Sequence, residues 1–267
     1  MTTIHITDLP QAQTRSETFL DDALCIVSHS GLHPTEKLLI EQLAQFSAAP
    51  ASLLIAGNRT GATALAAAAR FPGCAVTCHA FDVHHARAIL RNLDANGRQA
   101  AFLCDAFVSP PDDLRSSASD PRPAFTVACT SQIPSATYDA ALFMATPGTM
   151  TGELILDQLE DIQQNLAVGG TCVVACEAES APLLKQIKAI FGSLSVSFDK
   201  KGVFCASAVK REPLKRARDF SALFAASLAG GAPLSLCSLP GVFCHRRPDN
   251  GGLALAEIAA RELQPNQ

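Results

Sequence analysis

The sequence predicts an α/β protein, a three-layer sandwich around a mostly parallel seven-stranded sheet whose last strand is antiparallel. First, the apolar segment 52–56 enters a glycine-bearing turn that opens onto an alanine-rich helix. Second, apolar segments then alternate with amphipathic helical ones, as in sheets joined by crossover helices. Third, two apolar segments, 194–198 and 203–209, flank Asp199-Lys200-Lys201-Gly202 and predict a closing hairpin.

The individual elements follow from local patterns. Residues 1–22 are polar and are expected to be irregular, and 24–27 is the first apolar run and an expected strand. Pro34 suits the first turn of a helix, and we expect His33 beside it to be a capping or surface residue. The remaining expected strands are 52–56, 75–81, 100–104, 140–144 and 171–176, and the remaining helices are 62–70, 84–96, 153–166 and 182–191.

Composition narrows the functional classes. With 267 residues, 48% of them hydrophobic and 17% charged, the chain can bury a full core and is not disordered. No apolar run reaches the ~18 residues of a membrane span, and no signal peptide is visible, so the cytoplasm is expected. The ten cysteines lie mostly in apolar runs, which predicts reduced, buried thiols and no metal site.

The turn after segment 52–56 reads Gly57-Asn58-Arg59-Thr60-Gly61. Helix N–H groups at such a turn face any ligand above the strand end, and Asp82 follows the next strand, where a carboxylate can bond ribose hydroxyls. This order opens both dinucleotide-binding folds and class I S-adenosylmethionine (SAM) methyltransferases. However, Ile55 stands at the usual acidic position and Arg59 at the usual middle glycine, where a side chain fills the volume of close approach. The alternative is an ordinary tight turn.

The closing hairpin favours the methyltransferase layout, and most of the chain from about residue 50 resembles the N-terminal half of the bacterial small-subunit ribosomal RNA guanine-N2 methyltransferases. The resemblance is carried by 165–177, by 193–211, and by Ser-Leu-Pro-Gly-Val-Phe at 238–243 with Asp249 beyond. It implies an N-terminal extension with a lead-in helix (1–50), a methyltransferase-like domain (51–211), and a basic linker with a segment resembling the start of a second methyltransferase domain (212–267).

The resemblance also implies SAM as the cofactor. Its expected ligands are Gly57, Asn58, Gly61 and Asp82, together with Asp105 at the adenine. Thr146 and Pro147, in the loop after the fourth parallel strand, are the candidate catalytic residues. Family members carry Asn-Pro-Pro-Phe in this loop in their second, catalytic copy, whereas the first copy is degenerate and supports folding and RNA placement. Here the loop has neither an asparagine for the target amine nor an aromatic ring for the guanine.

Three functions therefore remain open: an active RNA methyltransferase, an auxiliary domain that has lost SAM binding, and a small-molecule methyltransferase with its own pocket. The segment 108–137 also allows two arrangements. It is either a mobile insertion, or its apolar stretch 125–129 is the true third strand and 100–104 an additional one. In the second case Asp105 loses its adenine role. A long irregular loop is uncommon within a compact domain.

Basic residues form two clusters although the net charge is −4. They are Lys200, Lys201, Lys210, Arg211, Lys215, Arg216 and Arg218 in the first cluster, and Arg246 and Arg247 in the second. Such clusters can contact RNA phosphates or a partner domain, and the alternative is solvated turns. The expected partners are ribosomal RNA or the small ribosomal subunit, and a second methyltransferase domain or a homodimer partner, with no membrane.

A faint internal echo links the two ends of the chain. Gly31-Leu32, Pro34 and 38–41 resemble Gly241-Val242, Pro248 and 253–257. A duplicated lead-in segment would give this pattern, and chance is the alternative.

Overall fold

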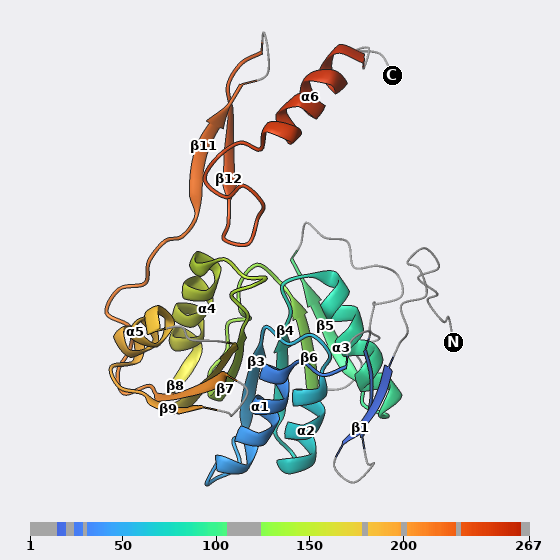
Figure 1. Cartoon of the computed structure of the whole chain (residues 1–267), viewed down its shortest axis with the longest axis vertical. Helices are drawn as coiled ribbons and strands as arrows, with labels where there is room; N and C mark the ends of the chain where they lie inside the picture. The colour runs from blue at the N-terminus through green and yellow to red at the C-terminus, as the bar shows by residue number, and fades with distance from the viewer. Residues whose placement is uncertain are drawn as a thin grey trace.

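The computed structural model describes residues 15–19, 24–28, 31–105, 124–177, 181–198, 202–227 and 231–262. Figure 1 shows an α/β body from which a hairpin and a helix project. No helix in these ranges is both long and apolar enough to cross a membrane.

The body is built on an eight-stranded sheet. Its strands in spatial order are β5 (Ala100–Cys104), β6 (Phe125–Cys129), β4 (Ala75–His79), β3 (Ser52–Ala56), β7 (Tyr138–Ala145), β8 (Leu166–Glu177), β10 (Val203–Val209) and β9 (Ser195–Phe198). The first six are parallel to one another, and β10 is antiparallel to both β8 and β9. This is the class I methyltransferase fold that the sequence predicts. The predicted count of seven strands is corrected to eight.

The additional strand is β5. It pairs with the outer side of β6, and β6 pairs with β4, so 125–129 is the third strand of the core sheet. The reason lies in burial: Phe125 and Val127 are buried, whereas Leu103 on β5 is exposed, and only strands covered on both faces require apolar residues throughout. Asp105 therefore follows an edge strand. The other residues of the uncertain segment, 106–123, lie outside the described ranges.

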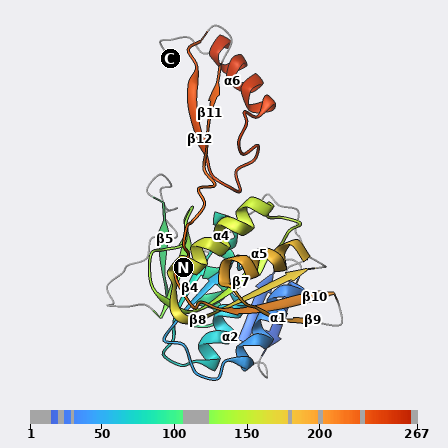
Figure 2. The ribbon, with the colours of Figure 1, turned by 90° about the vertical axis from the view of Figure 1, so that its left-hand side faces the viewer.

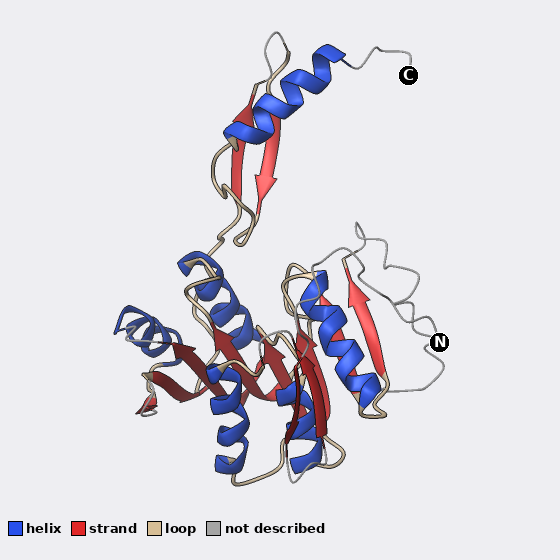
Figure 3. Ribbon diagram, turned by 45° about the vertical axis from the view of Figure 1, so that its right-hand side comes forward, coloured by secondary structure: helices blue, strands red, loops and turns tan. Residues whose placement is uncertain are grey.

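Helices cover both faces of the sheet (Figure 3). They are α1 (Pro34–Gln42) with the short 3-10 helix η1 (Leu43–Gln45), α2 (Ala62–Arg70) and α3 (Val83–Ala95) on one face, and α4 (Gly152–Asn165) and α5 (Ala181–Phe191) on the other. Strand β3 shows the alternation that this arrangement needs: Leu53 and Ile55 belong to the core beneath α1 to α3, and Leu54 belongs to the core beneath α4 and α5.

Two antiparallel hairpins lie outside the sheet. The first pairs β1 (Arg15–Phe19) with β2 (Leu24–Ser28), so the expectation of irregular structure throughout 1–22 is wrong for 15–19. The second pairs β11 (Ala222–Ala226) with β12 (Leu234–Ser238) and is followed by α6 (Asn250–Glu262). Figure 2 shows the second hairpin and α6 standing away from the body.

Candidate functional site

The turn between β3 and α2 lies at the carboxyl edge of the parallel strands. Gly57 has a φ of +71°, and a Cβ added to it would lie 2.6 Å from the carbonyl oxygen of Met144 on β7. Gly61 has a φ of +85°, and its Cβ would lie 3.2 Å from the side chain of Ile89 on α3. Close packing therefore requires glycine at position 57, and the left-handed backbone favours glycine at both positions, whether or not a ligand approaches them.

Asn58 bonds the turn to itself. Its side chain is buried, and Oδ1 accepts hydrogen bonds from the backbone N–H groups of Thr60 (3.1 Å) and Gly61 (2.9 Å). In such an Asx arrangement the side chain accepts hydrogen bonds from backbone N–H groups that could otherwise donate to a ligand. Asn58, a predicted cofactor ligand, thus bonds the backbone of its own turn.

The side chain of Glu36, on α1, lies at the start of α2. The sequence alone did not predict this contact. The Thr60 hydroxyl donates to Glu36 Oε1 at 2.7 Å. Burial raises the pKa of this carboxyl to about 7, opposed by the Thr60 hydrogen bond and by the backbone N–H groups of Thr63 and Ala62. In the sequence, Glu36 looks like an ordinary acid in the first turn of a helix, and nothing local marks it as buried.

Arg59 spans from this turn to the loop after β7. Its guanidinium donates to Thr149 Oγ1 at 2.9 Å, and Thr149 Oγ1 lies 2.8 Å from Thr146 Oγ1. Of the two candidate catalytic residues, Thr146 is thus buried in a chain of hydroxyl contacts and Pro147 is exposed. Arg59, at the usual position of the middle glycine, thus links by a hydrogen bond the two loops that would flank a cofactor.

Both predicted carboxylate ligands have partners in the chain. Asp82 accepts from the backbone N–H of His85 (2.8 Å) at the start of α3 and pairs with His85 Nδ1 at 2.6 Å. The hydrogen bond from the His85 side chain lowers the pKa of Asp82 to about 2. Asp105 accepts from the backbone N–H of Ser131, beyond the end of β6, at 2.8 Å.

His33 immediately precedes α1 and faces the end of β8. Its Nε2 lies 2.9 Å from a Glu177 carboxylate oxygen, and its Nδ1 lies 2.6 Å from Thr35 Oγ1. It holds the N-cap position of α1 but makes no side-chain cap. Burial lowers the pKa of His33, opposed by Glu177 and assisted by Arg59. The histidine thus belongs to the polar surroundings of the same edge.

The predicted RNA-binding residues divide into two groups. Lys210 is buried, and its Nζ donates to the carbonyls of Leu166 (2.6 Å) and Gln164 (3.1 Å). Arg218 is held by the buried carboxylate of Glu160. The side chains of Arg211, Lys215, Arg216 and Arg247 are exposed. Lys200 and Lys201 lie outside the described residues.

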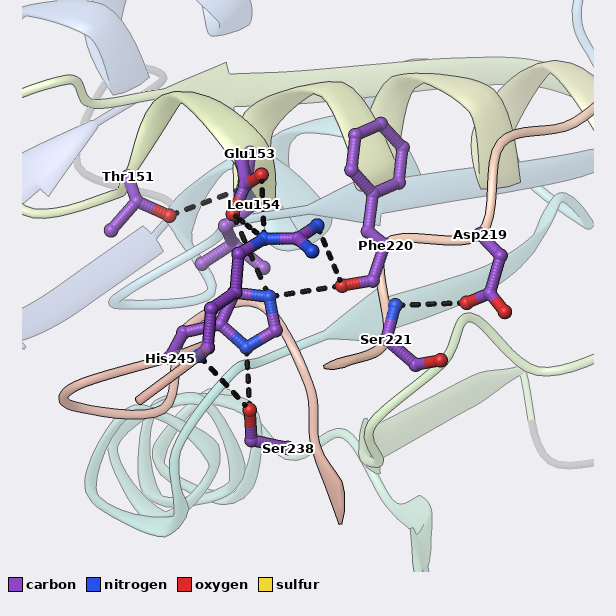
Figure 4. Close-up of polar contacts among 9 residues, drawn as sticks. Thr151, Glu153, Leu154, Asp219, Phe220, Ser221, Ser238 and His245 are labelled. Atoms are coloured by element: carbon purple, nitrogen blue, oxygen red, sulfur yellow. Dashed lines mark hydrogen bonds and ion pairs between the residues drawn. The ribbon is translucent and has the colours of Figure 1, made fainter. Parts of the chain in front are cut away.

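Figure 4 shows how the projecting part is attached at the start of α4. His245 Nε2 donates to the carbonyl of Phe220 at 2.9 Å, and its Nδ1 lies 2.7 Å from Ser238 Oγ. Arg246 Nε contacts both carboxylate oxygens of Glu153, at 3.1 and 3.2 Å. A Cβ on Gly241 would lie 3.3 Å from Leu154. Arg246 thus pairs within the chain.

A cavity of about 880 Å³ lies at the opposite, amino edge of the sheet. Hydroxyl and amide side chains line much of it, including Gln42, Gln45, Ser195, Ser197 and Ser207. It does not coincide with any of the predicted site residues.

Comparison with known proteins gives similarity at the level of fold. No protein-family model matches the sequence, and a search of curated proteins finds no match. Among solved structures, the T. thermophilus 16S rRNA N2 G1207 methyltransferase, in complex with AdoMet and guanosine, is 16% identical with a TM-score of 0.60. The match covers 92% of this chain and 58% of that one, so the chain spans somewhat more than half of the neighbour's length.

Two further methyltransferases resemble the chain more weakly. The ribosomal protein L11 methylase of Lactobacillus delbrueckii subsp. bulgaricus is 14% identical (TM-score 0.49, 67% of this chain and 81% of that one). A SAM-dependent methyltransferase of Agrobacterium tumefaciens is 13% identical (TM-score 0.49, 76% of this chain and 72% of that one).

Proposed function

We propose that this chain is an auxiliary methyltransferase-fold domain of the ribosomal RNA guanine-N2 type, which supports folding and RNA placement and does not itself transfer a methyl group. The observation that carries the proposal is the Arg59–Thr149 hydrogen bond, which ties together the two loops between which a cofactor would lie. The architectural likeness to the 16S rRNA methyltransferase supports the choice of substrate class.

The residues at the carboxyl edge do not fit SAM as they stand. Ile55, at the usual acidic position, is a buried aliphatic residue and offers no carboxylate to ribose or to an amino group. The N–H groups of Thr60 and Gly61 already donate to Asn58. The buried carboxyl of Glu36 lies at the start of α2 and accepts from the Thr60 hydroxyl. A ligand would have to displace each of these contacts, with a free-energy cost on the order of 1 kcal/mol or more per bond.

RNA contact is assigned to the exposed cations of the linker and the projecting part. Among the described residues of the predicted set, Arg211, Lys215, Arg216 and Arg247 are exposed, whereas the exposed side chains of Arg218 and Arg246 are paired with Glu160 and Glu153. Lysine and arginine bind phosphate without sequence preference, so this surface would position RNA rather than select a nucleotide.

Equilibrium calorimetry with SAM tests the loss of cofactor binding. We expect no binding at about millimolar ligand, whereas a Kd of roughly micromolar or tighter would overturn the loss of cofactor binding and favour an enzyme. Arg59→Gly removes the hydrogen bond between the two loops. Any gain of SAM affinity should occur in this variant and not in the control. Arg98→Gly, at an exposed arginine after α3, is the matched control. No gain in the Arg59 variant would count against the role given to this side chain.

RNA placement is tested by binding to a 16S ribosomal RNA fragment at two salt concentrations. Lys215→Glu with Arg216→Glu should weaken binding and lower its salt dependence, because each lost phosphate contact reduces the slope by about one. Lys185→Glu with Lys188→Glu, at two exposed lysines of α5, makes the same change in net charge and is the matched control. Equal effects of the two changes would refute the assigned surface. Methyl transfer to small subunits, nucleosides or small acceptors would instead reveal an active enzyme.

A further inference from the structure

The cavity at the amino edge of the sheet has a floor of small polar side chains. Strands β8, β10 and β9 form this floor, and η1 with the loop 46–51 forms the wall beside it. Helix α1 packs against β8 and β10, whereas β9 lies beyond it as the last strand of the sheet (Figure 1). The cavity therefore lies where the helical layer on this face of the sheet ends.

The pleat of the β9–β10 hairpin separates polar from apolar side chains. Ser195 pairs with Ser207, and Ser197 pairs with Cys205, so these four side chains share the face that lines the cavity. Ala206, between the last two of them on β10, belongs to the core beneath α4 and α5 on the other face. The hairpin thus has one apolar face and one face that carries three hydroxyl groups and a thiol.

The polar groups of the cavity are available to a ligand. In the part of the chain that the structure describes, a set of hydroxyl and carboxamide side chains around the cavity makes no hydrogen bond to protein. These are the side chains of Gln42, Gln45, Thr171, Ser195, Ser197 and Ser207. At the carboxyl edge, by contrast, the side chains of Asn58, Arg59 and Thr60 are all bonded within the chain.

A simple solvated edge of the sheet is the alternative explanation for these side chains. Proteins commonly protect an exposed sheet edge with charged side chains, lysine especially. The described floor of this cavity carries none, because its members are serine, threonine, valine and cysteine. Neutral hydroxyl groups gathered in a concave surface fit ligand binding better than edge protection.

The charge of the cavity disfavours ionic ligands. Among the described residues around it, only Asp139 is charged, and its Oδ2 already accepts from the N–H groups of Ala51 and Ser52, each at 2.9 Å. Burial raises the pKa of Cys205 to about 12, so its thiol is neutral. A phosphate or carboxylate would lose hydration here without meeting a cation. An exposed carboxylate such as Asp139 is also a weak anchor for a cationic ligand.

The groups of the cavity match a neutral ligand that is rich in hydroxyls. Hydroxyl and carboxamide side chains both donate and accept hydrogen bonds, and each hydroxyl of such a ligand does the same. Phe46 adds an apolar surface for C–H groups, and its ring is held edge to face on Phe71 with the centroids 5.9 Å apart. The volume of about 880 Å³ is typical of a small-molecule site.

We propose that this cavity binds a small neutral polyhydroxylated molecule, a sugar or polyol without phosphate or carboxylate. Gln42 and Gln45 would bond its hydroxyls from the wall, and the serines of β9 and β10 would bond them from the floor. The inference goes beyond the function proposed above. It does not depend on whether SAM binds, because the cavity lies at the opposite edge of the sheet from the β3–α2 turn.

Titration of the full chain with glycerol, D-ribose and D-glucose, followed by the NMR shifts of its backbone amides, tests the proposal. We expect at least one of these probes to bind saturably, with a Kd on the order of 1 mM or tighter. The shifted amides should lie in 45–51, 195–197 and 205–207. The phosphate ester of the same probe should bind at least about tenfold more weakly, because the cavity offers no cation.

Two matched pairs of variants test the assigned residues. Gln45→Leu and Ser197→Leu change exposed side chains of the wall and the floor, and each should weaken binding at least about fivefold. Gln132→Leu and Ser131→Leu make the same changes at exposed positions beyond the end of β6 and should leave the affinity unchanged. Amide shifts away from the cavity report whether each variant keeps its fold, as expected for surface changes.

Each other outcome overturns the proposal. No saturable shift with any of the neutral probes up to about 50 mM would show that the cavity is no site for this class. Shifts centred on another surface, or equal losses in the control variants, would refute the assigned residues. Equal or tighter binding of the phosphate esters would refute the charge argument. Failure of the auxiliary role would be recognised separately, because SAM affinity would overturn that role and leave the sugar result unchanged.

Discussion

Glu36 gives the protein a pH-dependent stability whose sign is opposite to that of most carboxylates. Its side chain is fully buried, and burial raises the pKa to about 7 from the ordinary value of 4.5. Between these values the folded chain holds a proton that the unfolded chain has lost. This contribution is therefore fully present below about pH 4.5 and is lost as the pH rises through 7.

The size of the effect follows from the two pKa values. At about 1.4 kcal/mol per pH unit, the difference between the two pKa values corresponds to roughly 3 kcal/mol of unfolding free energy. This amount is lost between about pH 4.5 and pH 7. Of this, about 2 kcal/mol falls between pH 5.5 and pH 8. Glu36→Gln removes the titration. It also places an amide donor near the N–H groups of Ala62 and Thr63, a cost that is the same at both pH values.

Urea unfolding at pH 5.5 and pH 8 measures the difference. Between these conditions, wild-type protein should lose about 2 kcal/mol more than Glu36→Gln. Glu41→Gln, at an exposed position of the same helix, should change with pH as the wild type does. If wild type and Glu36→Gln lose equal amounts, the carboxyl does not titrate between the two conditions and the account of the α2 start is wrong.

Two further changes test the packing of the carboxyl edge and of the β1–β2 hairpin. Gly57→Ala should unfold at much lower urea concentration than Gly73→Ala, because both positions have a positive φ but only the first would place a Cβ 2.6 Å from Met144 O. The left-handed conformation alone costs an alanine about 1–2 kcal/mol at either position. Equal losses of stability in the two variants would contradict the role of close approach. Asn92→Ala should lower the unfolding free energy by roughly 1–3 kcal/mol. It should also speed hydrogen exchange at the backbone amide of Val27. An unchanged exchange rate there would show that the Asn92 amide does not hold β2.

The sequence predicts those features that depend on local pattern. Strand β3, its glycine turn and α2 follow from an apolar run, Gly57 and Gly61, and a stretch of strong helix formers, all within twenty residues. The closing β9–β10 hairpin follows from two apolar runs around a turn. These features are set by neighbours in the chain, so a single sequence contains the information.

The features that the sequence leaves open depend on contacts between distant residues. Segments 100–104 and 125–129 are both short and apolar, and only burial on the finished sheet separates the edge strand from the central one. Strand β1 pairs with β2, whose other edge is held by amides about 65–71 residues away. Lys210 looks like a member of a basic cluster, but its ammonium group bonds carbonyls near the end of α4.

The two-stranded sheet of β11 and β12 also bears on how the protein behaves when purified alone. Unpaired strand edges next to exposed aliphatic side chains are templates for pairing with other molecules. At high concentration, the solubility of the isolated chain would then be governed by residues 222–238 rather than by the stability of its body.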